Sequence, residues 1–318
     1  MRHYPLKMVV LLVLLFVAVA VSMMVGVVHF SWQEIWQSPI FWNLRLPRIL
    51  LCMLVGAALS VSGAAYQSIF RNPLTDPYVL GISSGASLGA AIAILLGLEA
   101  CLWGIGGCAL VAALLTVWLI YSIASIGNRL HTTTLLLTGV CLTFLITAII
   151  SFLMVLHQDK MDSIIFWTMG SFASASWSDV LLVAPVVLVG VCVVLFYGKD
   201  LNLLLAGSET AQSMGVEVEK VKKTLLLFTT LMVAVAVSCC GVIGFVGLVV
   251  PHCMRLLVGA DNRKLMPMSI VAGALLMLVC DTLARTVLQP SELPVGSLTA
   301  LVGAPLFIYL LYRNNKRI

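Results

Sequence analysis

The chain has 318 residues, of which 61% are hydrophobic and 10% are charged, and its formal net charge is +5 at pH 7. This composition excludes a water-soluble globular protein and is typical of an integral membrane protein. The basic residues are not interleaved with aromatic ones and the nine cysteines show no CxxC spacing, so neither a nucleic-acid surface, a disulfide framework nor a metal site is predicted.

Ten apolar segments are long enough to cross a bilayer. Lipid offers no partner for backbone polar groups, so a spanning segment must be a helix or part of a closed barrel. Runs of roughly 18–25 apolar residues without alternation indicate helices. The expected spans are 8–28, 48–69, 79–97, 101–123, 134–156, 179–197, 224–240, 244–258, 265–288 and 297–312. The sequence therefore predicts an all-α polytopic membrane protein with a single transmembrane domain over residues 1–318.

The distribution of basic residues predicts the orientation in the membrane. An even number of spans places both termini on one side. If that side is the cytoplasm, fourteen of the 18 lysines and arginines lie inside, and four (Arg45, Arg48, Lys160 and Arg285) lie outside. The positive-inside rule therefore predicts cytoplasmic termini. Arg45 and Arg48 oppose that rule, and they either anchor the second span at the interface or receive acidic groups of an external partner.

The segment after the second span is predicted to form a tight inner turn. Asn72–Pro73 and Asp76–Pro77 interrupt it, and a residue before proline avoids the helical region. Two matches to Gly-x-Ser-x-Gly follow, at 81–85 and 85–89. A serine hydrolase needs this motif at a strand-to-helix turn and needs an acidic partner for its histidine, and no Asp or Glu lies near His252. We therefore interpret these small residues as a close helix-packing surface.

Residues 199–223 form the longest segment that is too polar to lie in the membrane. Asp200 and Ser208 stand where N-caps begin a helix, and Gly207 and Gly215 stand where left-handed C-caps end one. The segment is therefore predicted to form two or three short helices on the membrane surface.

An apolar stripe runs through this segment at helical spacing, formed by Ala211, Met214, Val218 and Val221. The stripe either packs on the protein's own body or docks a soluble partner. In the second case we expect Glu209, Ala211 and Met214 to form the exposed face of a short helix.

The ninth span carries two charges, Asp281 and Arg285. A charge at the bilayer centre costs about 2.5–3.5 kcal/mol on insertion scales, and the i,i+4 spacing allows these two side chains to pair. A structural ion pair is one interpretation. The other is a proton-coupled secondary transporter that uses Asp281 as its proton site.

The sequence holds no ATP-binding P-loop. The motif Gly-x-x-x-x-Gly-Lys-Ser/Thr requires a further glycine five residues before its Gly-Lys pair. The one Gly-Lys pair, Gly198–Lys199, is preceded by Val193 in that position and is followed by Asp200. ATP, if it drives this protein, must be bound by another chain.

Four stretches, at 45–89, 204–216, 241–263 and 292–311, resemble in order the FecCD-type permeases of ABC importers for iron–siderophore, haem and vitamin B12. The resemblance extends from about Leu44 to the C-terminus. It implies a type II importer permease fold with about ten helices and no catalysis or cofactor of its own. It also implies a homodimer in the inner (plasma) membrane, two cytoplasmic ATPase subunits that bind ATP and Mg, and an external substrate-binding protein.

The same resemblance implies three sets of functional residues. The set that couples the permease to the ATPase is Leu203, Gly207, Glu209, Ala211, Met214 and Gly215. The cytoplasmic gate is Asn72, Leu74, Thr132 and Thr133, and the residues that dock the binding protein are Arg45, Arg48 and Arg285.

Overall fold

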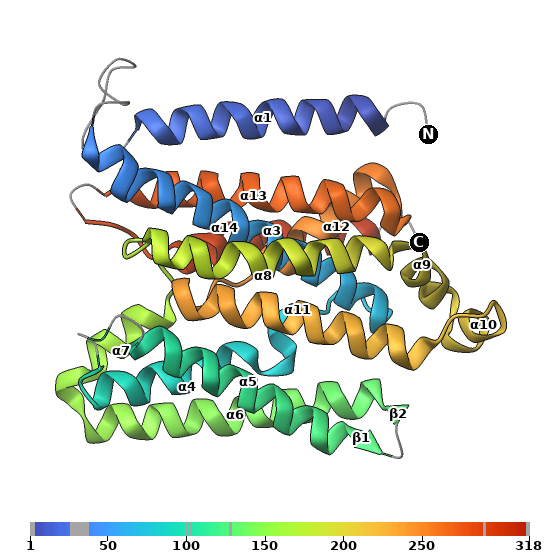
Figure 1. Ribbon diagram of the computed structural model, residues 1–318, viewed down its shortest axis with the longest axis horizontal. Helices are drawn as coiled ribbons and strands as arrows, with labels where there is room; N and C mark the ends of the chain where they lie inside the picture. The colour runs from blue at the N-terminus through green and yellow to red at the C-terminus, as the bar shows by residue number, and fades with distance from the viewer. Residues whose placement is uncertain are drawn as a thin grey trace.

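The computed structural model of the protein describes residues 4–25, 38–98, 101, 104–126, 129–288 and 291–315. Within these residues each of the ten expected spans contains a helix (Figure 1): α1 (Tyr4–Met24), α3 (Leu46–Ile69), α4 (Ile82–Leu95), α5 (Gly104–Ala124), α6 (Thr132–Leu156), α8 (Trp177–Phe196), α11 (Val218–Cys240), α12 (Val246–Val258), α13 (Asn262–Thr286) and α14 (Val295–Asn315). Seven helices of the described chain are long and apolar enough to cross a membrane, and Ile82–Leu95, Val246–Val258 and Val295–Leu310 are shorter apolar helices. The all-α polytopic fold is confirmed, although residues 26–28 of the first expected span lie outside the described residues.

Short elements connect these helices. They are η1 (Phe41–Arg45), η2 (Pro77–Leu80), η4 (Gln158–Lys160), α7 (Met161–Thr168), α9 (Gly198–Ala206), α10 (Ser208–Ser213), and the paired two-residue strands β1 (Ser125–Ile126) and β2 (Arg129–Leu130). The π-helical turn η1 runs directly into α3, so that Phe41–Ile69 forms one continuous span.

Helix α3 occupies the centre of the bundle and packs against α13, α12, α8 and α11. Most of its residues are buried on every side, because its many Gly, Ala and Ser residues let neighbouring backbones approach closely. At Gly63 this approach is so close that a β-carbon would collide with the carbonyl group of Gly247 in α12. Small side chains therefore fix the position of α3.

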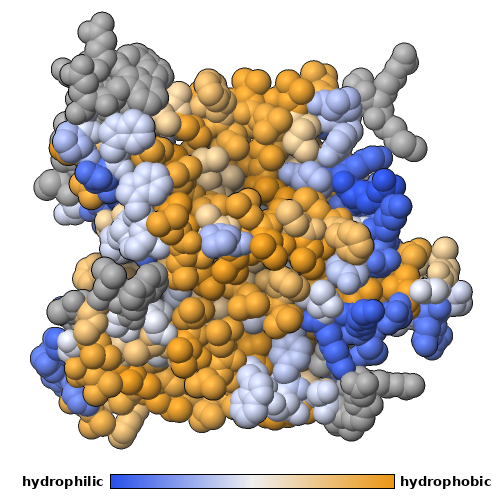
Figure 2. Space-filling model, viewed as in Figure 1, coloured by the Kyte–Doolittle hydropathy of each residue, from blue (hydrophilic) through white to orange (hydrophobic). Residues whose placement is uncertain are grey.

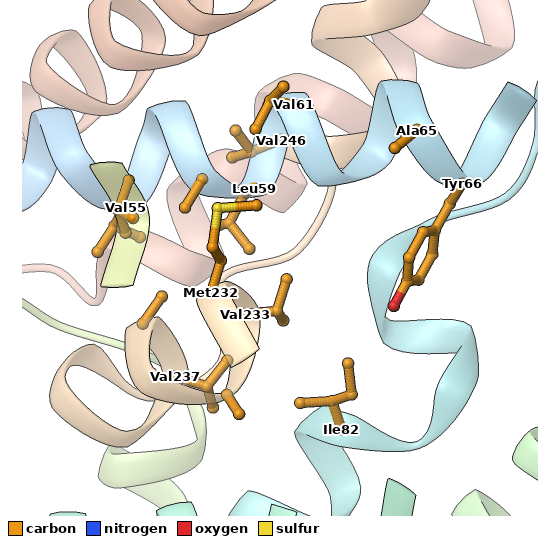
Figure 3. Close-up of a cluster of buried hydrophobic side chains, with 14 of the residues drawn as sticks. Val55, Leu59, Val61, Ala65, Tyr66, Ile82, Met232, Val233, Val237 and Val246 are labelled. Atoms are coloured by element: carbon orange, nitrogen blue, oxygen red, sulfur yellow. The ribbon is translucent and has the colours of Figure 1, made fainter. Parts of the chain in front are cut away.

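Apolar side chains fill the space between α3 and α11 (Figure 3). Val55 and Leu59 of α3 lie beside Met232 and Val233 of α11, and all four have at most 1% of their surface exposed. Nearby, the buried hydroxyl of Tyr66 lies 3.2 Å from Thr230 Oγ1, which satisfies it. This core holds together helices that are distant in sequence.

The two ends of the bundle differ. Helix α1 begins and α14 ends where α9 and α10 lie, hereafter the α9–α10 end, while α7 lies at the opposite end, hereafter the α7 end (Figure 1). An apolar belt separates these ends, and the most hydrophilic patch of the visible face lies at the α9–α10 end (Figure 2). The arrangement agrees with an even number of crossings.

Candidate functional site

Two short helices form the segment that was expected to couple with a soluble partner. Helices α9 and α10 are separated by Gly207, and Gly215 follows α10; both glycines have positive φ, 129° and 87°. The N-cap positions are occupied by Tyr197 and Gly207, so the expectation that Asp200 and Ser208 are N-caps is wrong. Asp200 lies instead in the first turn of α9, where a carboxylate still favours the helix N-terminus.

The apolar stripe of this segment is split between the protein's own core and solvent. Ala211 is fully buried, and Val218 and Val221 have 8% and 5% of their surface exposed, whereas Met214 is 64% exposed. The expectation that Ala211 is exposed is therefore wrong. The chain reverses at Gly215, where Val216 N donates to Ala211 O at 3.0 Å, and α11 then covers the alanine.

The exposed part of the segment borders a groove between α10 and the start of α11, with a volume of about 900 Å³. Glu209 and Gly215 line it. Met214 stands exposed directly before Gly215, while Leu203 is partly buried against the core. A groove beside an exposed methionine is a surface on which a partner side chain could pack.

The predicted gate residues lie in two segments at the α9–α10 end. Asn72 holds a tight turn: its Oδ1 accepts from Leu74 N at 2.9 Å, and its own N–H donates to Gln67 O at 3.1 Å. Leu74 is 50% exposed. Thr132 and Thr133 begin α6 directly after the β1–β2 hairpin. The turn expected at Asn72–Pro73 is thus present, and its apolar tip faces outward in a single copy of the chain.

The three predicted docking arginines gather at the α7 end. Arg48 binds two carboxylates, Asp281 (Nη2–Oδ1 2.9 Å) and Glu292 (Nη2–Oε2 2.9 Å). Arg285 Nε lies 3.1 Å from Asp281 Oδ2, and Arg45 Nη1 donates to Met23 O at 2.7 Å. Arg48 and Arg285 therefore join α3 and α13 around one buried carboxylate, while Arg45 holds η1 to the end of α1. Arg45, Arg48, Asp281, Arg285 and Glu292 are hereafter the arginine cluster.

Burial distinguishes the members of the arginine cluster. Arg45 and Arg285 have 7% and 5% of their surface exposed, and Arg285 Nη2 donates to Ser22 Oγ of α1 at 2.7 Å. Glu292 has 32% of its side chain exposed. Asp281 is completely buried between two guanidinium groups, which favours the structural ion pair over the proton site. Docking through these arginines stays a prediction.

Sequence reasoning missed a polar connection at the α9–α10 end. Asn202 of α9 donates through Nδ2 to Asp261 Oδ1 and accepts from Asn262 N, both at 2.8 Å. Ser68 of α3 donates to Asn262 Oδ1 at 3.1 Å. The hydrogen bond from Asn202 is the main cause that lowers the pKa of Asp261. The one local signal was an Asp before a helix, which predicts the N-cap of α13 but not its partners.

The hydrolase alternative gains no geometric support. The Gly-x-Ser-x-Gly matches lie at the start of α4 and within it, where the preceding element is the 3₁₀ turn η2 rather than a strand. His252 contacts Phe307 edge-on, with 5.6 Å between the ring centroids.

The comparisons with known proteins agree with this geometry. Residues 13–313 match the model of the FecCD transport family. The cobalamin import system permease protein of Halobacterium salinarum is 44% identical over 86% of this chain and 74% of its own length. The hemin transport system permease protein of Yersinia pestis is 38% identical over 96% of this chain and 95% of its own.

A solved structure shows the same fold. It is described as an inward-facing conformation of a metal-chelate type ABC transporter, with a TM-score of 0.88 and 35% identity over 97% of this chain and 99% of that one. The family model and these relatives each match most of the chain. The chain therefore belongs to the FecCD transport family and is a multi-pass permease of an ABC importer.

Proposed function

We propose that this permease carries an iron chelate of the siderophore type, haem or a cobalamin-type compound from an external binding protein into the cytoplasm. The observation that carries the proposal is that the two ends of the bundle differ. An exposed helical pair, α9–α10, lies at one end, and a cluster of arginines lies at the other. The relatives named for cobalamin and hemin import support a large, chelate-like substrate.

Energy would come from partner subunits. The sequence lacks a P-loop, so ATP and Mg belong to two separate ATPase subunits, and this chain is not itself an enzyme. The groove beside Glu209 and the exposed Met214 are the surface on which each ATPase would sit. The α9–α10 end, where α1 begins, α14 ends and the coupling loop 199–223 lies, would then face the cytoplasm of a cell with this chain in its inner (plasma) membrane. Both termini would be cytoplasmic.

The path would form between two copies of the chain. The gate turn exposes Leu74 at its tip, and an apolar side chain in this position is suited to pack against its counterpart in a second copy. The single permease domain of residues 1–318 would thus supply half of the path. A homodimer, two ATPases and one binding protein make up the proposed importer.

The test is substrate-stimulated ATP hydrolysis by the assembled importer in nanodiscs. The permease, its ATPase and its binding protein are purified together and offered ferric siderophores, haem and cobalamin in parallel. We expect one class to bind the binding protein tightly and to raise both hydrolysis and uptake. A complex that takes up none of the three classes but responds to another anion or metal would overturn the proposed substrate, and a permease that assembles with no ATPase would overturn the proposed mechanism.

A further inference from the structure

Hydrogen bonds between side chains connect α9 to the start of α13. The side-chain amide of Asn202 uses both of its ends, one on Asp261 Oδ1 and one on Asn262 N, each at 2.8 Å. Asp261 also caps α13 by accepting from Arg263 N at 3.1 Å. Hydrogen bonds fix distance and angle, so α9 cannot rotate against the start of α13 without breaking them.

The connection continues into the centre of the bundle. Asn262 and Ser68 are both fully buried, and Ser68 Oγ lies 3.1 Å from Asn262 Oδ1, sharing its one hydroxyl proton between this oxygen and Ala64 O at 2.9 Å. Ser68 is the second-last residue of α3. The tip of the gate turn, Leu74, follows six positions later, and Asn72 N donates back to Gln67 O at 3.1 Å. Three side chains thus connect the coupling helix to the helix end that carries the gate turn.

A neighbouring link ties the same end of α3 to α12. Gln67 Nε2 donates to Leu248 O at 3.2 Å, and its Oε1 accepts from Arg255 Nη2 at 3.2 Å. Gln67 is 1% exposed. The last turn of α3 is therefore held by polar groups from two directions, whereas apolar packing alone would be non-directional and would let it slide.

We propose that Asn202, Asn262 and Ser68 form a relay that fixes the gate turn to the position of α9. They are positioning residues, because they act through the helices α9, α13 and α3 that they connect. When the ATPase moves α9, the relay moves the last turn of α3, and Leu74 moves with it. The inference rests on the proposed function, since it assumes that α9–α10 receives the ATPase and that Leu74 belongs to the gate.

The test follows the gate and the ATPase separately. A cysteine at position 74 is introduced after the exposed Cys101, Cys141 and Cys192 have been replaced by serine, and its maleimide labelling is measured with and without nucleotide in the assembled importer. Asn202→Ala and Ser68→Ala are compared with the parent. In both variants we expect the rate of basal ATP hydrolysis to stay within about twofold of the parent. The nucleotide-dependent change in labelling at position 74 should fall at least about fivefold, and the uptake per ATP hydrolysed should fall by the same factor.

Matched controls separate the relay from simple damage. Ser122→Ala changes an exposed serine of α5, outside the coupling loop, whose hydroxyl donates to Trp118 O within the same helix. Ser62→Ala changes a buried serine of α3 whose hydroxyl has no hydrogen-bond partner among the described residues. Both controls should leave labelling and uptake unchanged. The double variant Asn202→Ala, Ser68→Ala should be no worse than the more severe single variant, since both break one connection.

The outcomes are distinguishable. Normal nucleotide-dependent labelling in both single variants would overturn the relay, and so would additive effects in the double variant. Loss of ATPase co-purification by Asn202→Ala would also overturn it, because Asn202 would then only support assembly. If the parent complex itself shows no nucleotide response at position 74, the proposed gate fails, which is a separate result.

Discussion

The guanidinium group of Arg48, near the start of α3, binds the carboxylate of Asp281 in α13, although 233 positions separate them. Nε lies 3.0 Å from Oδ1, and Asp281 has no exposed side-chain surface. Arg285 approaches the other oxygen at 3.1 Å. The buried carboxylate of Asp281, with its two arginine partners, ties the central helix α3 to α13. Removing one member of this group leaves a buried charge without its partner.

Asp281→Asn is therefore expected to destabilise the protein strongly. Losing one partner of a buried ion pair costs about 3–5 kcal/mol, and here two arginines lose their shared partner. The measurement is the apparent unfolding temperature in detergent. Glu292→Gln is the control, because Glu292 is 32% exposed and a pair at the surface contributes about 0–1 kcal/mol. Equal effects of the two variants would contradict the structural role of Asp281.

Met214→Asp is expected to prevent docking of the ATPase without harming the permease. Met214 is 64% exposed, so the folded chain tolerates a charge there, but burying that charge in a partner would cost several kcal/mol. A loss of about 3 kcal/mol weakens binding more than a hundredfold. Co-purification and the ATPase affinity measure the effect, with Met214→Leu as control. Normal uptake by Met214→Asp would show that the contact lies elsewhere.

The gate prediction concerns Leu74 and Thr133. Cysteines at these two positions in both copies should form crosslinks in the resting importer and fewer crosslinks when nucleotide is bound. A cysteine at position 137 is the control, because Leu137 is 62% exposed on the same helix as Thr133, about one turn further along it. Crosslinking that ignores nucleotide at both positions would remove these residues from the gate.

Asp76 makes the stability depend on pH. Burial raises its pKa from 3.8 to about 6, although a hydrogen bond from Tyr78 N opposes the shift. The folded state therefore holds the proton more tightly than the unfolded chain, so stability is greatest below pH 4 for this group and falls as pH rises through 6. The loss is about 1–3 kcal/mol. Asp76→Asn, which can still accept from Tyr78 N, should unfold at a higher temperature at pH 7.5 and lose this dependence.

The control for the Asp76 experiment is Asp159→Asn, on the exposed turn η4. It should leave the pH profile unchanged. If Asp76→Asn is no more stable than the parent at pH 7.5, burial does not penalise the ionised carboxylate.

Local patterns predicted the helices and some of the site. Apolar runs predicted a helix in each of the ten expected spans, and seven of these helices, within the described residues, have the length and hydropathy that crossing lipid demands. The i,i+4 pair of Asp281 and Arg285 was also visible in the sequence, since helical spacing alone brings these residues together. The non-helical connection between α11 and α12 contains a residue with left-handed backbone geometry, Phe245 with φ 68°. No local preference predicts this geometry for a phenylalanine.

Contacts between distant segments could not be predicted in the same way. Asn202 and Asp261 are 59 positions apart, and Arg48 and Glu292 are 244 apart. Ala211 and Met214 belong to the same apolar stripe in the sequence, yet Ala211 is buried and Met214 is exposed. The difference arises because the chain reverses at Gly215. Helical periodicity describes one helix and does not say what covers it.

The last prediction concerns docking of the binding protein at the arginine cluster. Arg48 holds Glu292 through two hydrogen bonds, of 3.1 and 2.9 Å, and this carboxylate is the exposed member of the cluster. If the binding protein offers its own carboxylate to Arg48, it must compete with Glu292. Glu292→Gln should then tighten docking of the binding protein. Charge reversal of Arg45 and Arg48 should weaken docking, and the binding that remains should be less sensitive to salt.

These variants also separate docking from folding. Reversal at Arg48 breaks the buried pair with Asp281, so a loss of docking by that variant alone has two explanations. Glu292→Gln leaves that pair intact, and a gain of affinity cannot come from damage. Each exposed pair contributes about 0–1 kcal/mol, so the expected gain is at most about fivefold, measured as binding-protein affinity at low and high salt. If Glu292→Gln and the reversals leave affinity and its salt dependence unchanged, the arginines serve the fold alone.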